Sequence, residues 1–218
     1  MKHLTSLLLL VGCWQYAGAQ MLSAAPQKAK AADTLSSVFV SHSVTASISF
    51  GFIDEYRNQF DVPVGFQKNN ISGFVPVYGR LEYALSSHMG LAASMVYDEF
   101  YANYYQLYTG NGKEFKRART DMTTIYSGGL SLNYHFGHII PVKKLDVFLT
   151  AGVLLNNIHH SARPQGDSTI AFVDREVTPV LRVGARYYIS NKSSFMLDAG
   201  LDKHSVFSLG YSVRFLKH

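Results

Sequence analysis

The sequence has almost no cysteine or tryptophan, and it contains no long apolar run. Cys13 and Trp14 are the single residues of their kinds among the 218. Both precede Gln20, where Ala17-Gly18-Ala19 predicts the cut that removes a signal peptide of residues 1–19. The cleaved chain contains no cysteine, which excludes a disulfide-stapled fold. The apolar run of that peptide is also too short for a membrane-spanning helix, which needs about 20 residues.

A second interpretation of the N-terminus stays open. Leu10-Val11-Gly12-Cys13 resembles a lipoprotein box, and processing there would leave a lipid anchor on Cys13. In both cases we expect residues 20–37, rich in alanine, serine and lysine, to form a flexible lead-in. The folded domain is then expected over 38–218.

The charge pattern excludes several function classes. The net charge is +5, but the basic residues are dispersed, so nucleic-acid binding is not expected. The glycine-rich stretch Gly110-Asn111-Gly112 is typical of a tight hairpin turn and not of a phosphate-binding loop. No cofactor is therefore expected. His135 and His138 could approach a metal together but lack a third ligand, so no metal site is predicted.

What the sequence does contain is alternation of apolar and small polar residues. A mean hydropathy of +0.02 is what alternating strands produce on average. Counting this alternation predicts eight strands. They cover 43–52, 74–85, 89 to at least 98, 123–136, 145–157, 178–189, 195–202 and 206–215. Short and long connections alternate between them, and we expect Pro76 at the outer end of the second strand.

The composition of the two faces predicts which one is outside. The polar face consists mainly of serine, threonine and glycine, whereas the lysines lie in turns and loops. Small side chains suit the crowded interior of an eight-stranded barrel, and aromatic residues end the apolar face as they do where hydrocarbon meets water. We therefore predict an all-β, eight-stranded antiparallel up-and-down transmembrane β-barrel. The alternative is a lipocalin-like soluble barrel with its apolar face inward.

The last strand carries a family resemblance. Its outward face is apolar and aromatic almost to the carboxyl end, and it resembles the terminal targeting strand of bacterial outer-membrane β-barrels, although Leu216, Lys217 and His218 follow it here. With its eight strands, the chain resembles the small OmpX-like and OmpA-barrel-like porin-family proteins. This resemblance implies recognition by the barrel-assembly machinery of the outer membrane. The residues concerned are Phe207, Leu209, Gly210, Tyr211, Val213 and Phe215.

Several large charged residues fall on the small-residue face. In a closed lumen they must pair, because an unpaired buried charge costs several kcal/mol. We predict an ion-paired network that fills the lumen, with an ion or proton path as the alternative. Its members are Arg80, Glu82, Arg182, Arg186, Asp198 and Arg214, with Asp98 and Asp146 on the same face.

The stretch 97–119 predicts a hairpin that extends beyond the membrane. Aromatic residues precede the Asn-Gly turn and basic residues follow it, a combination that could bind glycans, lipopolysaccharide phosphates or a protein strand. The alternative is that these rings only pack the hairpin against other loops. The candidates are Phe100, Tyr101, Tyr104, Tyr105, Tyr108, Lys113, Lys116, Arg117 and Arg119.

One pattern suggests catalysis. His159 and Ser161 are two residues apart, with Glu176 the nearest glutamate, as in some outer-membrane lipid A deacylases. Nothing else matches that family, so no catalytic residue is predicted. The resemblance implies a non-enzymatic outer-membrane protein that contacts lipid and lipopolysaccharide and acts in adhesion or envelope structure. A lipid-modifying enzyme and a narrow ion pore are the alternatives.

Overall fold

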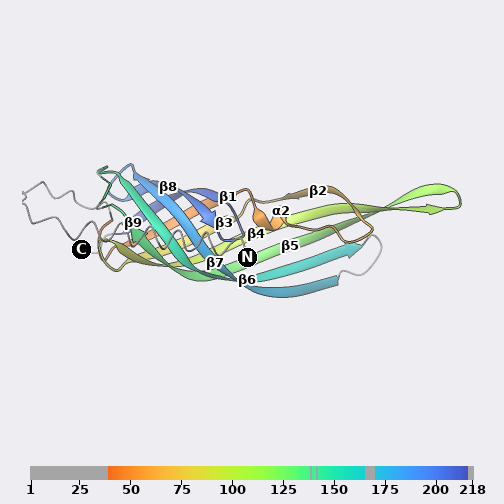
Figure 1. The fold of residues 1–218 in the computed structure, drawn as a ribbon, viewed down its shortest axis with the longest axis horizontal. Helices are drawn as coiled ribbons and strands as arrows, with labels where there is room; N and C mark the ends of the chain where they lie inside the picture. The colour runs from red at the N-terminus through yellow and green to blue at the C-terminus, as the bar shows by residue number, and fades with distance from the viewer. Residues whose placement is uncertain (1–38, 138, 141, 165–169, 216–218) are drawn as a thin grey trace, which may run out of the picture. The chain divides into compact units, whose positions relative to one another are not determined.

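The computed structural model describes residues 39–137, 139–140, 142–164 and 170–215, which are almost entirely antiparallel β-strand (Figure 1). The predicted signal peptide and lead-in lie outside these residues. One short helix, α2 (Glu55–Asn58), and one short strand, β2 (Gln67–Gly73), accompany the longer strands. Those are β1 (Val44–Phe52), β3 (Val77–Ala84), β4 (Met89–Gly110), β5 (Lys113–His135), β6 (Leu145–Pro164), β7 (Ile170–Tyr188), β8 (Ser193–Leu201) and β9 (Phe207–Phe215).

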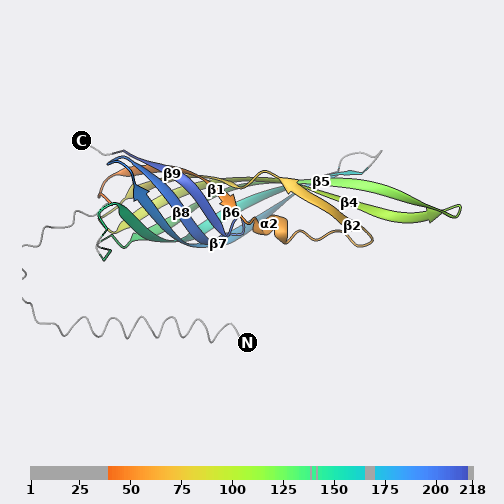
Figure 2. The same ribbon diagram turned by 90° about the horizontal axis from the view of Figure 1, so that it is seen from above.

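Eight of the strands close into a ring (Figure 2). From β3 onward each strand pairs with the next one in the chain, and β1 pairs with both β3 and β9. The strand β2 stands outside the ring and pairs with the distal part of β4. The predicted eight-stranded antiparallel up-and-down barrel is confirmed.

The two faces of the barrel have the predicted orientation. Val183 and Leu209 are 55% and 52% exposed on the outer surface, whereas Ser49 and Thr150 are buried in the lumen. Along β9 the inward Ser208, for example, lies between outward neighbours. The lipocalin-like alternative, which needs the apolar side chains inside, is therefore wrong.

Outward aromatic rings border the apolar belt. Tyr97 and Tyr126 lie directly opposite each other on β4 and β5 with their rings 5.4 Å apart, and Phe195 and Phe215 are exposed near the other end of their strands. No helix among the described residues is long and apolar enough to cross a membrane. The architecture is that of a transmembrane β-barrel, because its oily surface is continuous around the outside and its polar groups are enclosed.

The strands differ greatly in length. β4 and β5 have 22 and 23 residues and continue past the belt as a hairpin, with β6 and β7 following them part of the way (Figure 1). Asn111 and Gly112 at the hairpin turn have φ values of 52° and 71°, the positive values that a tight two-residue hairpin requires. The opposite end of the barrel has short turns, such as the one between β3 and β4.

The region 53–73 departs from the sequence-based prediction, which treated it as a loop. It contains α2 and β2, and β2 escaped the count because its sequence QKNNISG has Ile71 as its one large apolar residue and does not alternate. The predicted strand 74–85 is also too long at its start. The ladder begins at Val77, directly after Pro76, because proline has no N–H to donate.

The apolar belt predicts that a charged side chain on its outer surface lowers the stability of the barrel. Leu130 is 60% exposed and lies halfway between the outward Tyr126 and Tyr134, in the part of β5 that crosses the belt. We expect Leu130→Arg to lower the free energy of unfolding by about 2–4 kcal/mol in lipid vesicles, because the guanidinium must enter hydrocarbon. Urea titration of vesicle-embedded protein measures this. Ala171→Arg, on the exposed end of β7, is the control, and equal stability of the two variants would contradict the belt.

Candidate functional site

The lumen near the short-turn end contains a compact group of ionised side chains. Arg186 on β7 reaches across the barrel to Glu82 on β3, with Nη2 and Oε2 2.5 Å apart, and its Nη1 lies 3.6 Å from Asp146. Asn133 donates to the second oxygen of Glu82. All four side chains are fully buried, so these contacts substitute for water.

His135 completes this group, and it was not among the predicted lumen residues. Its Nε2 lies 2.9 Å from Glu82 and its Nδ1 lies 2.8 Å from Asp146. Two carboxylates on the two ring nitrogens require both nitrogens to donate, so the imidazole carries a positive charge. Phe39 stacks on this ring with the centroids 3.4 Å apart, which closes this end of the lumen with an apolar group.

A second ionised group lies nearer the other end of the barrel. Arg182 contacts Asp198 and Asp202, each at 2.6 Å, and donates to the carbonyl of Ser205 at 2.9 Å. The phenol ring of Tyr78 lies 5.5 Å from its guanidinium carbon. Asp202 was predicted as the end of a strand and not as a lumen residue, but it anchors the turn between β8 and β9 from inside.

Two predicted members of the network form no ion pair among the described residues. Arg80 is buried, and its Nη1 has no hydrogen-bond partner among the residues described. Arg214 stacks on the Tyr188 ring at 4.1 Å instead of contacting Asp198. Arg214 therefore lies near the short-turn end of the lumen and away from Asp198, although both were predicted as members of one network.

The lumen is filled over most of its length. Phe148 packs over Gly184, directly opposite it on β7, so a Cβ there would collide with the ring. Beside Arg182 and Asp202 a cavity of about 20 Å³ is lined also by Arg80, Tyr78 and apolar side chains such as Leu154. A cavity of this size admits about one water molecule. Side chains therefore occupy the described lumen at the level of both ionised groups.

Helix α2 covers the mouth of the barrel at the end with long loops. Tyr56 accepts a hydrogen bond from Asn156 at 2.8 Å and donates to Glu176 at 3.2 Å, and Lys203 pairs with the same carboxylate. Burial, followed by the charge of Glu176, raises the pKa of the Tyr56 hydroxyl. The phenol therefore stays neutral and can hold both contacts.

Asp54 begins the helix and also faces the mouth. Its carboxylate accepts the Arg57 backbone N–H at 2.9 Å, as an N-cap residue does. Burial, with the nearby Asp98 carboxylate as the second cause, raises the pKa of Asp54 to about 6. Asp98 in turn lies 3.5 Å from the buried imidazole of His204.

The base of the protruding hairpin is packed and not free. Phe100, Ile125 and Ile158 form a small apolar cluster, against which Phe60 and Ile71 of the covering segment pack. Phe66 contacts the ring of Tyr104 edge-on, and Tyr104 is 2% exposed. The structure therefore removes Phe100 and Tyr104 from the candidate binding residues, as the packing alternative predicted.

Tyr104 also locks the two long strands to each other. Its hydroxyl donates to Asp121, which accepts a second hydrogen bond from Arg119 at 2.9 Å. Burial and this hydrogen bond raise the pKa of Tyr104, so the proton remains on the phenol. Arg119 is thus engaged within the hairpin and is unsuited to hold a ligand.

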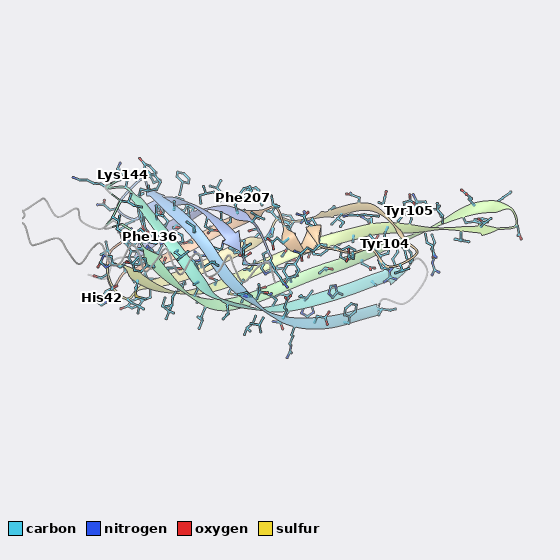
Figure 3. The ribbon with its side chains drawn as sticks, viewed as in Figure 1. His42, Tyr104, Tyr105, Phe136, Lys144 and Phe207 are labelled. Atoms are coloured by element: carbon cyan, nitrogen blue, oxygen red, sulfur yellow. The ribbon has the colours of Figure 1, made fainter. Side chains whose placement is uncertain are left out.

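The remaining candidates lie near the tip. Tyr108 stacks on Phe115 across the strands with centroids 5.4 Å apart, and Lys116 lies 3.8 Å above the Tyr105 ring. Tyr101 is half-buried and donates to Glu99. Lys113 and Arg117 are exposed. Figure 3 shows Tyr104 and Tyr105 on the extension, far from His42, Phe136 and Lys144 at the short-turn end.

The candidate assembly residues lie on β9, which joins β1 to β8. Leu209, Tyr211 and Phe215 are exposed on the outer face, and Phe207 and Val213 are partly covered there. Gly210 points inward against Ser49. Recognition of this strand by an assembly machinery stays a prediction.

The candidate catalytic group is not assembled. His159 and Ser161 occupy outward positions of β6, whereas Glu176 lies on the inner face opposite Asn156 and is held by Tyr56 and Lys203. His138 lies outside the described residues, and His135 is committed to two carboxylates. No group of three potential metal ligands occurs in the described part of the chain.

Comparisons with known proteins give structural matches alone. No family model and no curated protein matches the sequence. Among solved structures, the Ail protein of Yersinia pestis in complex with the heparin analogue sucrose octasulfate matches with a TM-score of 0.46 and 7% identity, covering 81% of this chain and 100% of Ail. The N-terminal β-barrel domain of Pseudomonas aeruginosa OprF matches with a TM-score of 0.40 and 19% identity, covering 80% and 98%. The eight-stranded antiparallel ring described above rests on the strand pairing of this chain itself.

The ionised group near the short-turn end predicts a large loss of stability for a near-isosteric change of Glu82. Glu82→Gln keeps the shape but leaves Arg186 and His135 with one carboxylate between them. We expect the free energy of unfolding to fall by about 3 kcal/mol, since removing one partner leaves a buried charge without its counter-charge. Urea unfolding in detergent micelles measures this. Glu114→Gln, on the exposed hairpin, is the matched control, and equal stability of both variants would contradict the pairing.

The pKa of Asp54 predicts that the covering helix responds to pH. Between about pH 4 and pH 6 the folded chain keeps a proton that the unfolded chain loses, so stability falls as pH rises through this window. Hydrogen exchange of α2 should accordingly be slower at pH 4.5 than at pH 7 after correction for intrinsic rates. Asp54→Asn keeps the helix cap and should abolish the difference. A pH response that persists in Asp54→Asn would assign it to another group.

Proposed function

We propose that the chain is a non-enzymatic integral protein of the bacterial outer membrane that acts through its protruding hairpin. The observation that carries this proposal is a continuous apolar belt around a lumen filled by ion pairs. The short turns lie on the periplasmic side, and the extension of β4 to β7 lies outside the cell, as expected for barrels of this architecture. A blocked lumen leaves the external surface as the place where function resides.

The two alternative functions have less support. A pore requires an open lumen, but Arg182 and Arg186 with their carboxylates cross it, and α2 covers one mouth. A deacylase requires a base, a nucleophile and an orienting carboxylate on one face, whereas Glu176 faces the opposite side from His159 and Ser161.

The chemistry of the hairpin tip favours an acidic glycan as ligand. Lys113, Lys116 and Arg117 are exposed within a few residues of one another, against the single acidic Glu114. The stacked pair Tyr108 and Phe115 offers a flat apolar surface of the kind on which sugar rings pack. Guanidinium and ammonium groups bind sulfate or carboxylate through charge-assisted hydrogen bonds.

A protein ligand is the second candidate, because β7 has a free edge. β7 pairs with β8 from Leu181 onward. Over residues 170–180, the edge of β7 that faces away from β6 therefore pairs with no described strand. A partner strand could add there by main-chain hydrogen bonds. Val173→Pro would abolish such binding and leave glycan binding intact.

Localisation tests the membrane part of the proposal. The full chain expressed in a Gram-negative host should sediment with the outer membrane and migrate faster on gels before boiling than after. Recovery in the soluble fraction would overturn the membrane placement.

The tip makes a specific binding prediction. Replacing Lys113, Lys116 and Arg117 together by glutamine should weaken binding of heparin, used as a sulfated probe, by about tenfold or more, since each lost charge-assisted contact contributes about 1.5 kcal/mol. Surface plasmon resonance on detergent-purified protein measures this. The matched control replaces Lys143 and Lys144 at the other end of the barrel by glutamine. Equal loss in the control would indicate nonspecific charge attraction.

A further inference from the structure

Three strands carry a row of polar side chains on their outer faces directly above the apolar belt. Tyr126 on β5 lies opposite Asn157 on β6, and Asn157 lies opposite Arg175 on β7. His159, two residues above Asn157, contacts the Tyr126 ring edge-on at 5.8 Å. Strand alternation points all four side chains away from the barrel axis.

The four side chains of the row carry one permanent positive charge and include no carboxylate. An outward carboxylate, Glu99 on β4, lies beyond Thr124 at the height of His159. It accepts hydrogen bonds from Tyr97 and Tyr101. Arg175 is exposed and forms no ion pair or hydrogen bond within the described part of the chain. Its neighbours Asp174 and Glu176 alternate to the inner face, where Asp174 lies 3.8 Å from His160 and Glu176 binds Lys203. The row therefore presents hydrogen-bond donors and one permanent positive charge to whatever surrounds the barrel at this height.

Large apolar side chains lie immediately below the row. Leu155 and Val177, opposite each other on β6 and β7, are 57% and 63% exposed and form the upper margin of the belt at this point. A ligand that contacts both the polar row and the apolar side chains below it must combine an anionic headgroup with an apolar body. A phosphate monoester has up to two negative charges and accepts hydrogen bonds from a guanidinium in bidentate geometry.

We propose that Tyr126, Asn157, His159 and Arg175 form a binding site for the phosphate of a membrane lipid, whose acyl chains pack on Leu155 and Val177. This proposal rests on the membrane placement given above and adds a defined lipid contact to it. The site is open on the outer surface and is separate from the hairpin tip. Because it is a shallow row and not a pocket, a free phosphate ion would gain too few contacts there to be held.

The test uses native mass spectrometry of the full chain in neutral detergent with three probes. These are dipalmitoyl phosphatidic acid, which carries a phosphate monoester, dipalmitoylglycerol, which lacks it, and inorganic phosphate. We expect phosphatidic acid to bind the unmodified chain, and Arg175→Gln to weaken that binding by about tenfold. Asn157→Leu should weaken it less, because Arg175 remains.

Lys144→Gln is the matched control, since it removes one positive charge at the opposite end of the barrel (Figure 3). Unchanged binding in Arg175→Gln would overturn the site. Equal binding of dipalmitoylglycerol would show contact with the acyl chains alone, and displacement by inorganic phosphate would show a free-phosphate site, so either result also overturns the proposal. Failure of the membrane placement would be seen separately, as loss of sedimentation with the outer membrane in the unmodified chain.

Discussion

The structure depends on neutralising charge inside a barrel that has no room for bulk water. An eight-stranded ring leaves space for side chains alone, so a buried ion is stabilised there by a counter-charge or, as for Arg214, by an aromatic ring. Near the short turns, Glu82 and Asp146 are balanced by Arg186 and by a doubly protonated His135. Farther along, Arg182 holds two carboxylates, which leaves one negative charge in excess. Arg80, which forms no ion pair among the described residues, lines the same cavity as Arg182 and Asp202.

Much of the barrel could be predicted from the sequence because one physical rule governs most of it. Where one face meets hydrocarbon and the other a crowded lumen, apolar and small residues must alternate, and the ring strands show this pattern. The same rule fails above the belt, where both faces of a strand meet water or loops. β2, with its sequence QKNNISG, and the distal ends of β6 and β7 have no alternation to count, so the prediction missed β2 and shortened the other two.

The site was predicted less completely, for a different reason. Arginines and acids on the small-residue face are visible in sequence, but their partners depend on which strands face each other across the ring. Glu82 meets Arg186 from a position 104 residues away. His135 was considered only as a metal ligand, because its two carboxylate neighbours come from different strands. Phe39 precedes the first strand, and no pattern indicates that its ring closes the lumen.

The filled lumen and the packed base of the hairpin leave the tip as the part of the extension whose aromatic and basic side chains stay exposed. Phe100 and Tyr104 are buried under the covering segment and are not exposed for binding. Their packing fixes the direction of β4 and β5. A hairpin rising from a rigid base loses less conformational entropy when its tip binds than a free loop of equal length would. Phe100 and Tyr104, which resemble a binding surface in the sequence, therefore support the hairpin that carries Tyr108, Phe115 and the basic side chains.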